Sequence, residues 1–202
     1  MIPDEHFERF DTKKYRSKSR VKRWLIRRFA RSLFDLVIEA GPLERVLEIG
    51  VGEGFLSGFL SERLPTVDFW GIDLSEADIG RLRQKFPRIH GQVGSIYDVA
   101  SLGQRFDVVV CAEILEHLDD PGRALDAVHA LAPRRAIFSV PHEPWFMLSN
   151  LAAGKNVTRL GNDPEHINHF GNKSFAKLLE SRFRVDRQVT SYPWILALTT
   201  PR

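Results

Sequence analysis

The sequence has one cysteine, no long apolar run and no internal repeat. With Cys111 alone, the chain excludes an intramolecular disulfide framework and any zinc cluster built from several cysteines. No stretch approaches the roughly 18–20 apolar residues that a membrane-spanning helix needs. The start, MIPDEHFERF, lacks an apolar signal region. We therefore expect a cytoplasmic protein whose 202 residues form a single domain with a full core.

Acidic residues are scarce at the start of the chain, and the positive charge collects there. Residues 1–31 hold 11 Lys or Arg and 4 Asp or Glu, a balance of +7. The whole chain has 29 basic and 26 acidic residues, so the remaining 171 residues hold 18 and 22, a balance of −4. This segment is either a solvated helix face or a peripheral contact with a membrane or another anionic partner. A nucleic acid is not the favoured partner, because nucleic-acid binders spread basic residues over the working face.

Apolar strand patterns alternate with amphipathic helix patterns along most of the chain. Residues 19–40 have helical spacing, and Gly41-Pro42 ends that helix. Five strand patterns separated by helices follow. The two closing strands are joined by a link too short for a crossover helix, so they should pair antiparallel. These patterns predict an α/β fold, a doubly wound, Rossmann-like, seven-stranded and mainly parallel sheet with an antiparallel last strand and helices on both faces.

The stretch EIGVGEG, directly after the first core strand, indicates a ligand site. Glycines at alternate positions, Gly50, Gly52 and Gly54, permit positive φ and let a ligand approach main-chain N–H groups. A dinucleotide loop would read G-x-G-x-x-G, but its third glycine position is Phe55 in this chain. Glu48, just before the loop, would repel a pyrophosphate and would favour a cationic ligand.

Asp73 ends the second strand pattern and suits a ribose diol, since a carboxylate can accept from two adjacent hydroxyls. Asp73 alone would fit NAD equally well. S-adenosyl-L-methionine carries an ammonium and a sulfonium and has no phosphate. Glu48 and the glycine spacing therefore favour this cofactor over NAD.

Four stretches, VLEIGVGEG, GIDLS, GSIYD and FDVVVCAEILEHLDDP, carry a family resemblance. In order and spacing they resemble the motifs of class I S-adenosylmethionine-dependent methyltransferases. The E-x-L-E-H-x-x-D-P pattern is similar to the ubiquinone-biosynthesis O-methyltransferase-like branch, also called methyltransferase type 11. The resemblance implies S-adenosyl-L-methionine as cofactor and S-adenosyl-L-homocysteine as product. It also implies the cofactor-binding residues, which are Glu48, Gly50 and Gly52 (methionine end), Asp73 and Leu74 (ribose and adenine), Ser95 and Ile96 (adenine), and Ala112 and Glu113 (closing the pocket).

Four histidines are candidates for removing a proton from a hydroxyl acceptor, a role that suits histidine near neutral pH. His117 follows the fourth strand pattern, His142 follows the fifth, and His166 and His169 lie further along the chain. All four can reach the crevice at the carboxyl ends of the strands. For each histidine taken alone, a structural or substrate-positioning role is favoured over that of general base.

The stretch EILEH also has an interpretation that involves a metal ion. On a helix, Glu113, Glu116 and His117 would share one face and could hold Mg²⁺ or Mn²⁺ together with His166 or His169. That constellation is similar to the one in small-RNA terminal-nucleotide 2′-O-methyltransferases, and the basic N-terminal helix would then grip phosphates. The same stretch is typical of metal-free quinone-type relatives, and we expect no metal.

We expect two segments to cover the site. The N-terminal segment should act as a lid, with residues 1–18 mobile without ligand, and Trp145 and Phe146 should line the acceptor pocket. Residues 141–171 fit no regular element, and a loop of that length is usually functional. The single domain, residues 1–202, then has four parts: the basic segment and helix (1–41), the cofactor-binding half (42–140), the insertion that caps the substrate (141–171) and the C-terminal helix and strands (172–202).

Together these patterns predict a methyltransferase that acts on a small, apolar or aromatic acceptor, with O-methylation favoured. Two alternatives stay open. One is a metal-assisted RNA 2′-O-methyltransferase, and the other is a cofactor-binding module without turnover.

Overall fold

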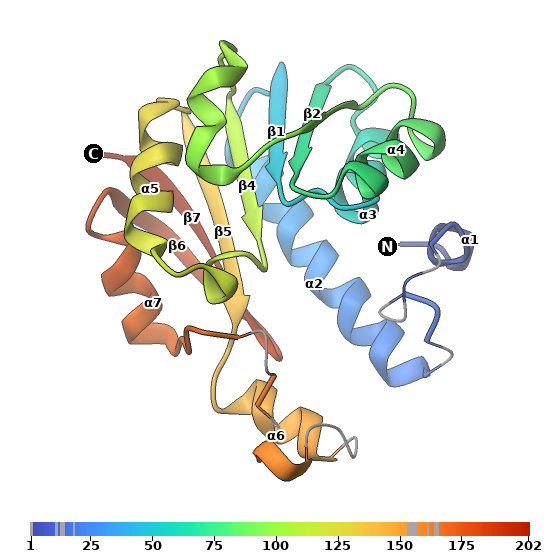
Figure 1. Ribbon diagram of the computed structural model, residues 1–202, viewed down its shortest axis with the longest axis vertical. Coiled ribbons are helices and arrows are strands. Elements are labelled where there is room, and N and C mark those ends of the chain that lie inside the picture. Colours follow the sequence, from blue (N-terminus) through green and yellow to red (C-terminus); the bar gives the residue numbers. More distant parts are fainter. Residues whose placement is uncertain are drawn as a thin grey trace.

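A computed structural model describes residues 2–10, 12, 15–17, 19–152, 157–160, 162–163 and 166–202. Its centre is one seven-stranded sheet with the order β3-β2-β1-β4-β5-β7-β6 (Figure 1). β7 pairs antiparallel with both β5 and β6, and the other pairs are parallel. The predicted topology is confirmed. The strands are β1 (Arg45–Ile49), β2 (Asp68–Asp73), β3 (His90–Val93), β4 (Val108–Ala112), β5 (Arg135–Pro141), β6 (Phe183–Ser191) and β7 (Trp194–Pro201).

Helices cover both faces of this sheet, which explains why the central strand β4 is buried at all five residues. One apolar cluster joins α1, α2, α3 and α4 to one face, and a second joins η1, η2, α5 and α7 to the other. The helices are α1 (Asp4–Glu8), α2 (Arg20–Glu39), α3 (Phe55–Arg63), α4 (Glu76–Lys85), α5 (Pro121–Ala130), α6 (Trp145–Ala152) and α7 (Asn172–Leu179), with short 3₁₀ turns η1 (Ile96–Leu102), η2 (Leu115–His117) and η3 (Val157–Arg159).

Residues 2–10 pack into the core, which corrects, for these residues, the expectation of a mobile segment over residues 1–18. Ile2, Phe7 and Phe10 are at most 1% exposed. His6 is buried beside them and its Nε2 donates to the Phe55 carbonyl oxygen at 2.8 Å. An isolated five-residue helix is unstable in water, so these contacts hold α1 in place.

Part of the N-terminal positive charge is neutralised within this segment. The Asp4 carboxylate accepts from Arg23 at 2.8 Å and from Arg27 at 2.6 Å, and both arginines lie in α2. These two ion pairs lower the pKa of Asp4. The basic face of α2 is therefore partly an internal contact with α1.

Two further expectations about local structure are wrong. The stretch EILEHL forms only the short turn η2, and Glu113 before it has a left-handed backbone with φ of 59°. The insertion, expected to lack regular structure, contains α6 and η3. Figure 1 shows α6 at one end of the molecule, beyond the end of β5. Among the described residues, no helix combines the length and the apolar character needed to cross a membrane.

Candidate active site

The glycine loop connects β1 to α3 at the carboxyl edge of the sheet. Gly50 has φ of 71°, and a Cβ built on it would lie 2.7 Å from Cδ1 of Ile114. Gly52 has φ of 53°, and a Cβ there would meet nothing within 4 Å. Gly50 is therefore required by both backbone shape and close packing, whereas Gly52 is required by backbone shape alone.

Glu48 is buried beneath this loop, with 4% of its surface exposed. Its Oε2 accepts from the Ser57 backbone N–H at 2.9 Å and also from the Ser57 hydroxyl. Both donors come from the first turn of α3, where the helix dipole favours a negative charge. Burial raises the pKa of the neighbouring Cys111 thiol, and Glu48 adds to this effect, so Cys111 is not a candidate nucleophile.

Asp73, the last residue of β2, fastens the glycine loop to its neighbouring strand. Its Oδ2 accepts from the Gly52 N–H at 2.8 Å, and its Oδ1 accepts from the Ser75 N–H at 2.9 Å. Each carboxylate oxygen has a second lone pair with which to accept from a ligand. The next side chain, Leu74, is 77% exposed although it is apolar. This exposed surface is available to a flat ligand group.

Ser95 and Ile96 follow the neighbouring strand β3 and have different environments. The Ser95 hydroxyl accepts from the Tyr97 N–H at 3.2 Å and caps η1. Ile96 is 5% exposed and belongs to the core cluster that contains η1 and α5. These local contacts are structural, and a role of the two residues toward adenine stays a prediction.

A cavity lies between the glycine loop, the N-terminal segment and β7. Five predicted cofactor residues line it, namely Glu48, Gly50, Gly52, Ala112 and Glu113. Trp145 and Phe146 are not among the described residues that line this cavity, so their place at the acceptor pocket stays a prediction. The remaining described lining residues are Thr12, Tyr15, Ile26, Phe29, Val51, Glu53, Phe55, Leu56, Asp78 and Trp194.

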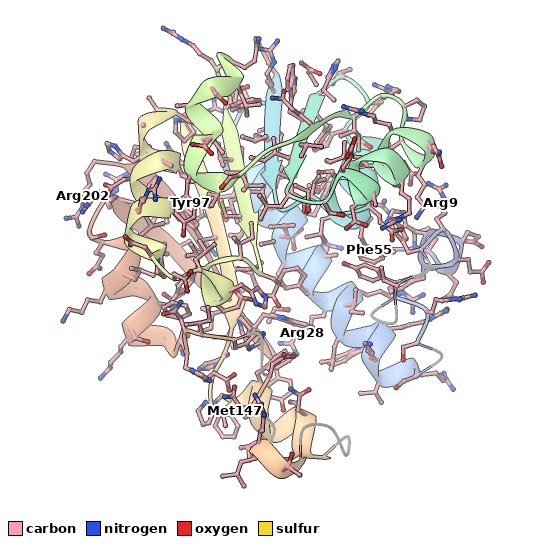
Figure 2. All side chains as sticks on the ribbon, in the orientation of Figure 1. Arg9, Arg28, Phe55, Tyr97, Met147 and Arg202 are labelled. Atoms are coloured by element: carbon pink, nitrogen blue, oxygen red, sulfur yellow. The ribbon has the colours of Figure 1, made fainter. Side chains whose placement is uncertain are left out.

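The apolar part of this lining was missed from the sequence. Ile26 and Phe29 lie three residues apart on α2 and share its buried face. The Tyr15 ring stacks on that of Phe55, the first residue of α3, with 3.7 Å between centroids, and Figure 2 shows the Phe55 side chain on the side of the N-terminal segment. Trp194 comes from the opposite end of the chain. The helical stripe of α2 was the available sequence signal, whereas the position of Trp194 depends on strand pairing.

Glu113 and Trp194 are in direct contact in this cavity. The indole Nε1–H of Trp194 donates to Oε2 of Glu113. The Glu113 backbone N–H donates to Ser139 on β5, at 3.2 Å to its Oγ. The Glu113 carboxylate therefore points across the sheet edge toward β7.

Two of the four candidate histidines come together beside η2. The rings of His117 and His166 lie 5.0 Å apart. Ligand atoms of Glu116, His117 and His166 all lie within 4.8 Å of one another. The chain after His166 is fastened to η2, because the Ile167 N–H donates to the Glu116 carbonyl oxygen at 2.8 Å. These three residues could together ligate a cation. Glu113, which the metal interpretation had included, is not part of the group.

The other two candidates, His142 and His169, lie near each other but outside this group. His142 forms an isolated bridge with Phe170, and burial lowers the pKa of its imidazole. His169 Nε2 lies 2.9 Å from Oδ1 of Asn162. None of the four histidines is among the described residues that line the cavity.

Comparison with known proteins places this geometry in a family. A model of the methyltransferase domain matches residues 18–182, which is more than half of the chain. The chain belongs to the methyltransferase family. In sequence, this methyltransferase is 36% identical over 93 residues to a ubiquinone biosynthesis O-methyltransferase from Pseudomonas aeruginosa. That match covers 44% of this chain and 39% of the relative, so the chain accounts for well under half of that protein's length.

Solved structures share the whole fold of this methyltransferase. Magnesium protoporphyrin IX methyltransferase from Synechocystis PCC 6803, with bound S-adenosylhomocysteine, has a TM-score of 0.71 and 20% identity, covering 98% of this chain and 94% of that one. The N-methyltransferase NodS from Bradyrhizobium japonicum, with the same ligand, has a TM-score of 0.68 and 20% identity, covering 98% and 96%. The predicted class I S-adenosylmethionine-dependent methyltransferase fold is confirmed.

Proposed function

We propose that this protein transfers the methyl group of S-adenosyl-L-methionine to a small, apolar or aromatic acceptor, most often at a hydroxyl. The observation that carries the proposal is the pair of carboxylates at one loop. Glu48 is buried under the glycines, and Asp73 holds the Gly52 N–H from the next strand. An ammonium group and a ribose diol are the chemical partners that such carboxylates favour.

The residues present fit the cofactor. Glu48 would hold the ammonium of its methionine end, Asp73 would accept from the ribose hydroxyls, and the exposed Leu74 would pack on the adenine. Gly52 leaves open space where a side chain would otherwise stand. When bound, the cofactor supplies a methyl group already activated by a positive sulfur. The protein then has to align an acceptor and exclude water.

The apolar part of the cavity supports a small apolar acceptor. Ile26, Phe29 and Trp194 are each at most 8% exposed, and all three line the cavity. The relative named as an O-methyltransferase supports a hydroxyl acceptor. For the proton of that hydroxyl, His117, His142, His166 and His169 stay candidates. His117 and His166 are favoured, because Ile114, just before η2, packs against Gly50 of the loop.

A second candidate function is metal-assisted methylation of an RNA 2′-hydroxyl, favoured by the convergence of Glu116, His117 and His166. An imidazole pair with one carboxylate suits Mn²⁺ or a similar ion. We keep it second because displacement at an activated methyl requires no Lewis acid. A cofactor-binding module without turnover is the third reading.

We also propose that the start of α2 contacts an anionic surface. Val21 and Trp24 there are 68% and 56% exposed. The Arg28 guanidinium lies 5.6 Å from the Trp24 ring, an arrangement that suits a bilayer interface. Sedimentation with anionic vesicles should retain the protein, Trp24→Ala should weaken that retention, and equal retention by neutral vesicles would contradict the contact.

Labelled methyl transfer tests the main proposal directly. The protein should move a labelled methyl from S-adenosylmethionine to members of a panel of small phenols, and not to RNA. Transfer to RNA alone, dependent on added Mn²⁺, would move the second candidate to first place. Binding of S-adenosylhomocysteine without transfer to any acceptor would favour the module without turnover.

A further inference from the structure

Trp194 is held in the cavity by contacts with a helix and with a carboxylate. It begins β7 and is 8% exposed. Its ring centroid lies 5.0 Å from that of Phe29 on α2, and its indole N–H donates to the Glu113 carboxylate. The indole is thus held by a helix on one side and by a charged acceptor at its edge. A charge-assisted hydrogen bond of this kind is stronger than one between neutral groups.

Glu113 in turn is fixed by the neighbouring strand. Its N–H donates to both the carbonyl oxygen and the hydroxyl of Ser139 on β5, each at 3.2 Å. The Ser139 hydroxyl also lies 3.4 Å from Oε1 of Glu113. The hydrogen bond between Glu113 and Trp194 therefore depends on three adjacent strands at the edge of the sheet. Glu113 follows β4, Ser139 lies on β5 and Trp194 begins β7.

The backbone of Glu113 is strained for a residue with a side chain, since φ is 59°. Such a conformation persists only where the surrounding contacts compel it. Here the Glu113 carboxylate accepts from the indole of Trp194. A glycine would adopt this backbone without strain but could not hold the indole.

From this geometry we propose that Trp194 selects a planar aromatic acceptor by stacking, and that Glu113 is the positioning residue that holds its indole. This inference rests on the proposed function and names its substrate class. Offset-stacked aromatic pairs gain free energy beyond the burial of their area. Because the indole is already fixed, its side chain loses little conformational entropy when an acceptor stacks on it.

A matched pair of ligands tests the selection. We would titrate naphthol and its saturated analogue decahydronaphthol into the protein loaded with S-adenosylhomocysteine and compare the two Kd values by calorimetry. The wild type should bind naphthol about tenfold more tightly. Trp194→Leu should reduce this ratio to within about twofold, and Trp194→Phe should keep part of it. Trp24→Leu, which removes an exposed tryptophan of α2, should leave the ratio unchanged.

The positioning role of Glu113 has a spectroscopic test. The near-UV circular dichroism of the wild type minus that of Trp194→Phe gives the band of the fixed indole. Glu113→Ala should lose this band and the naphthol preference together. Glu113→Gln, whose amide oxygen can still accept from the indole, should restore most of both. If Glu113 only supported the fold, both variants would lower the melting temperature, but the indole band would be the same in Glu113→Ala and Glu113→Gln.

The outcomes separate this inference from the proposed function. Failure to bind S-adenosylhomocysteine would overturn the proposed function itself. Binding of that ligand with equal affinity for naphthol and decahydronaphthol, or with no naphthol binding, would overturn the inference alone. An unchanged indole band in Glu113→Ala would overturn the positioning role and leave selection by Trp194 standing.

Discussion

Asp73 acts in this protein both as a structural acceptor and as the proposed ribose ligand. One oxygen holds the glycine loop through the Gly52 N–H, and the other holds the turn into α4 through the Ser75 N–H. The bound ligand would therefore meet a carboxylate that is already oriented. Such preorganisation lowers the entropy lost on binding.

Asp73→Ala should remove most of the thermal stabilisation that S-adenosylhomocysteine gives. At about 100 times its Kd, a ligand adds about 2.7 kcal/mol, which raises the melting temperature of a chain of this length by about 5–10 °C. Differential scanning fluorimetry with and without the ligand measures the shift. Asp126→Ala, at a surface ion pair with Arg182, should keep the full shift. A larger shift with NAD would show that the interpretation of Glu48 and the glycines is wrong.

At the level of single residues, His6 should make the free energy of unfolding depend on pH. Burial lowers the pKa of its imidazole below the ordinary 6.5, and the hydrogen bond to the Phe55 carbonyl oxygen only partly offsets this. As the pH falls below about 6.5, the unfolded chain takes up the proton before the folded one. The free energy of unfolding should therefore decrease until the pH passes the folded-state pKa.

Urea unfolding at pH 7.5 and pH 5.5 tests this sign. His6→Gln, whose amide can still donate to the Phe55 carbonyl oxygen, should show a smaller decrease between the two values than the wild type. Phe10→Leu is the control, because it loses core packing but keeps the imidazole and should keep the wild-type decrease. If the glutamine variant follows the wild type, His6 does not carry the dependence.

At the scale of elements, the strands and the glycine loop were predictable because their signals are local. β4 reads as an unbroken apolar run, and the loop between β1 and α3 has its glycines in sequence. The end of β4 was not predictable in the same way. Glu113 has helix-compatible neighbours, but its contacts with Ser139 and Trp194 hold it in a left-handed turn. Long-range contacts decided against local propensity there.

The same reason explains the missed parts of the site. α1 has five residues and is held by Phe55, which lies 49 positions from His6. Trp194 reaches the cavity because β7 pairs antiparallel with β5, with Trp194 opposite Pro141. Neither contact leaves a pattern in the nearby sequence. The glycine loop and its carboxylates were therefore predictable, and the apolar wall of the cavity was not.

The turn η2 carries the prediction about metal. We expect cofactor binding and turnover to survive EDTA, and Glu116→Gln to cost little beyond stability. Calorimetry with Mn²⁺ and turnover with and without chelator measure this. If a metal is used, His166→Ala should abolish a Mn²⁺-dependent activity while His169→Ala, outside the converging group, retains it. That result would contradict our expectation.

At the scale of the whole molecule, the N-terminal segment before α2 packs into the core and also lines the cavity. Ile2, Phe7 and Phe10 lie in the same apolar cluster as α2, α3 and α4, and Tyr15 further along lines the cavity. The ion pairs of Lys85 and Arg81 with Glu53 connect α4 to the glycine loop, and the Lys85 ammonium lies 4.7 Å from the Phe10 ring. Removing this segment should therefore affect stability and ligand binding together.

Deletion of residues 1–10 should lower the melting temperature by more than about 10 °C and weaken S-adenosylhomocysteine binding as well. Burial of each of three large apolar side chains contributes about 1.5–3 kcal/mol, a sum comparable with the net stability of a whole domain, about 5–15 kcal/mol. Tyr15→Ala is the matched comparison, because it removes one wall of the cavity and leaves Ile2, Phe7 and Phe10 in place. Its melting temperature without ligand should stay within about 4 °C of the wild type, since half-buried side chains contribute less. A deletion variant that melts like the wild type but loses turnover would instead mean that the segment is a detachable lid, whose contacts with Phe55 form only around bound ligand.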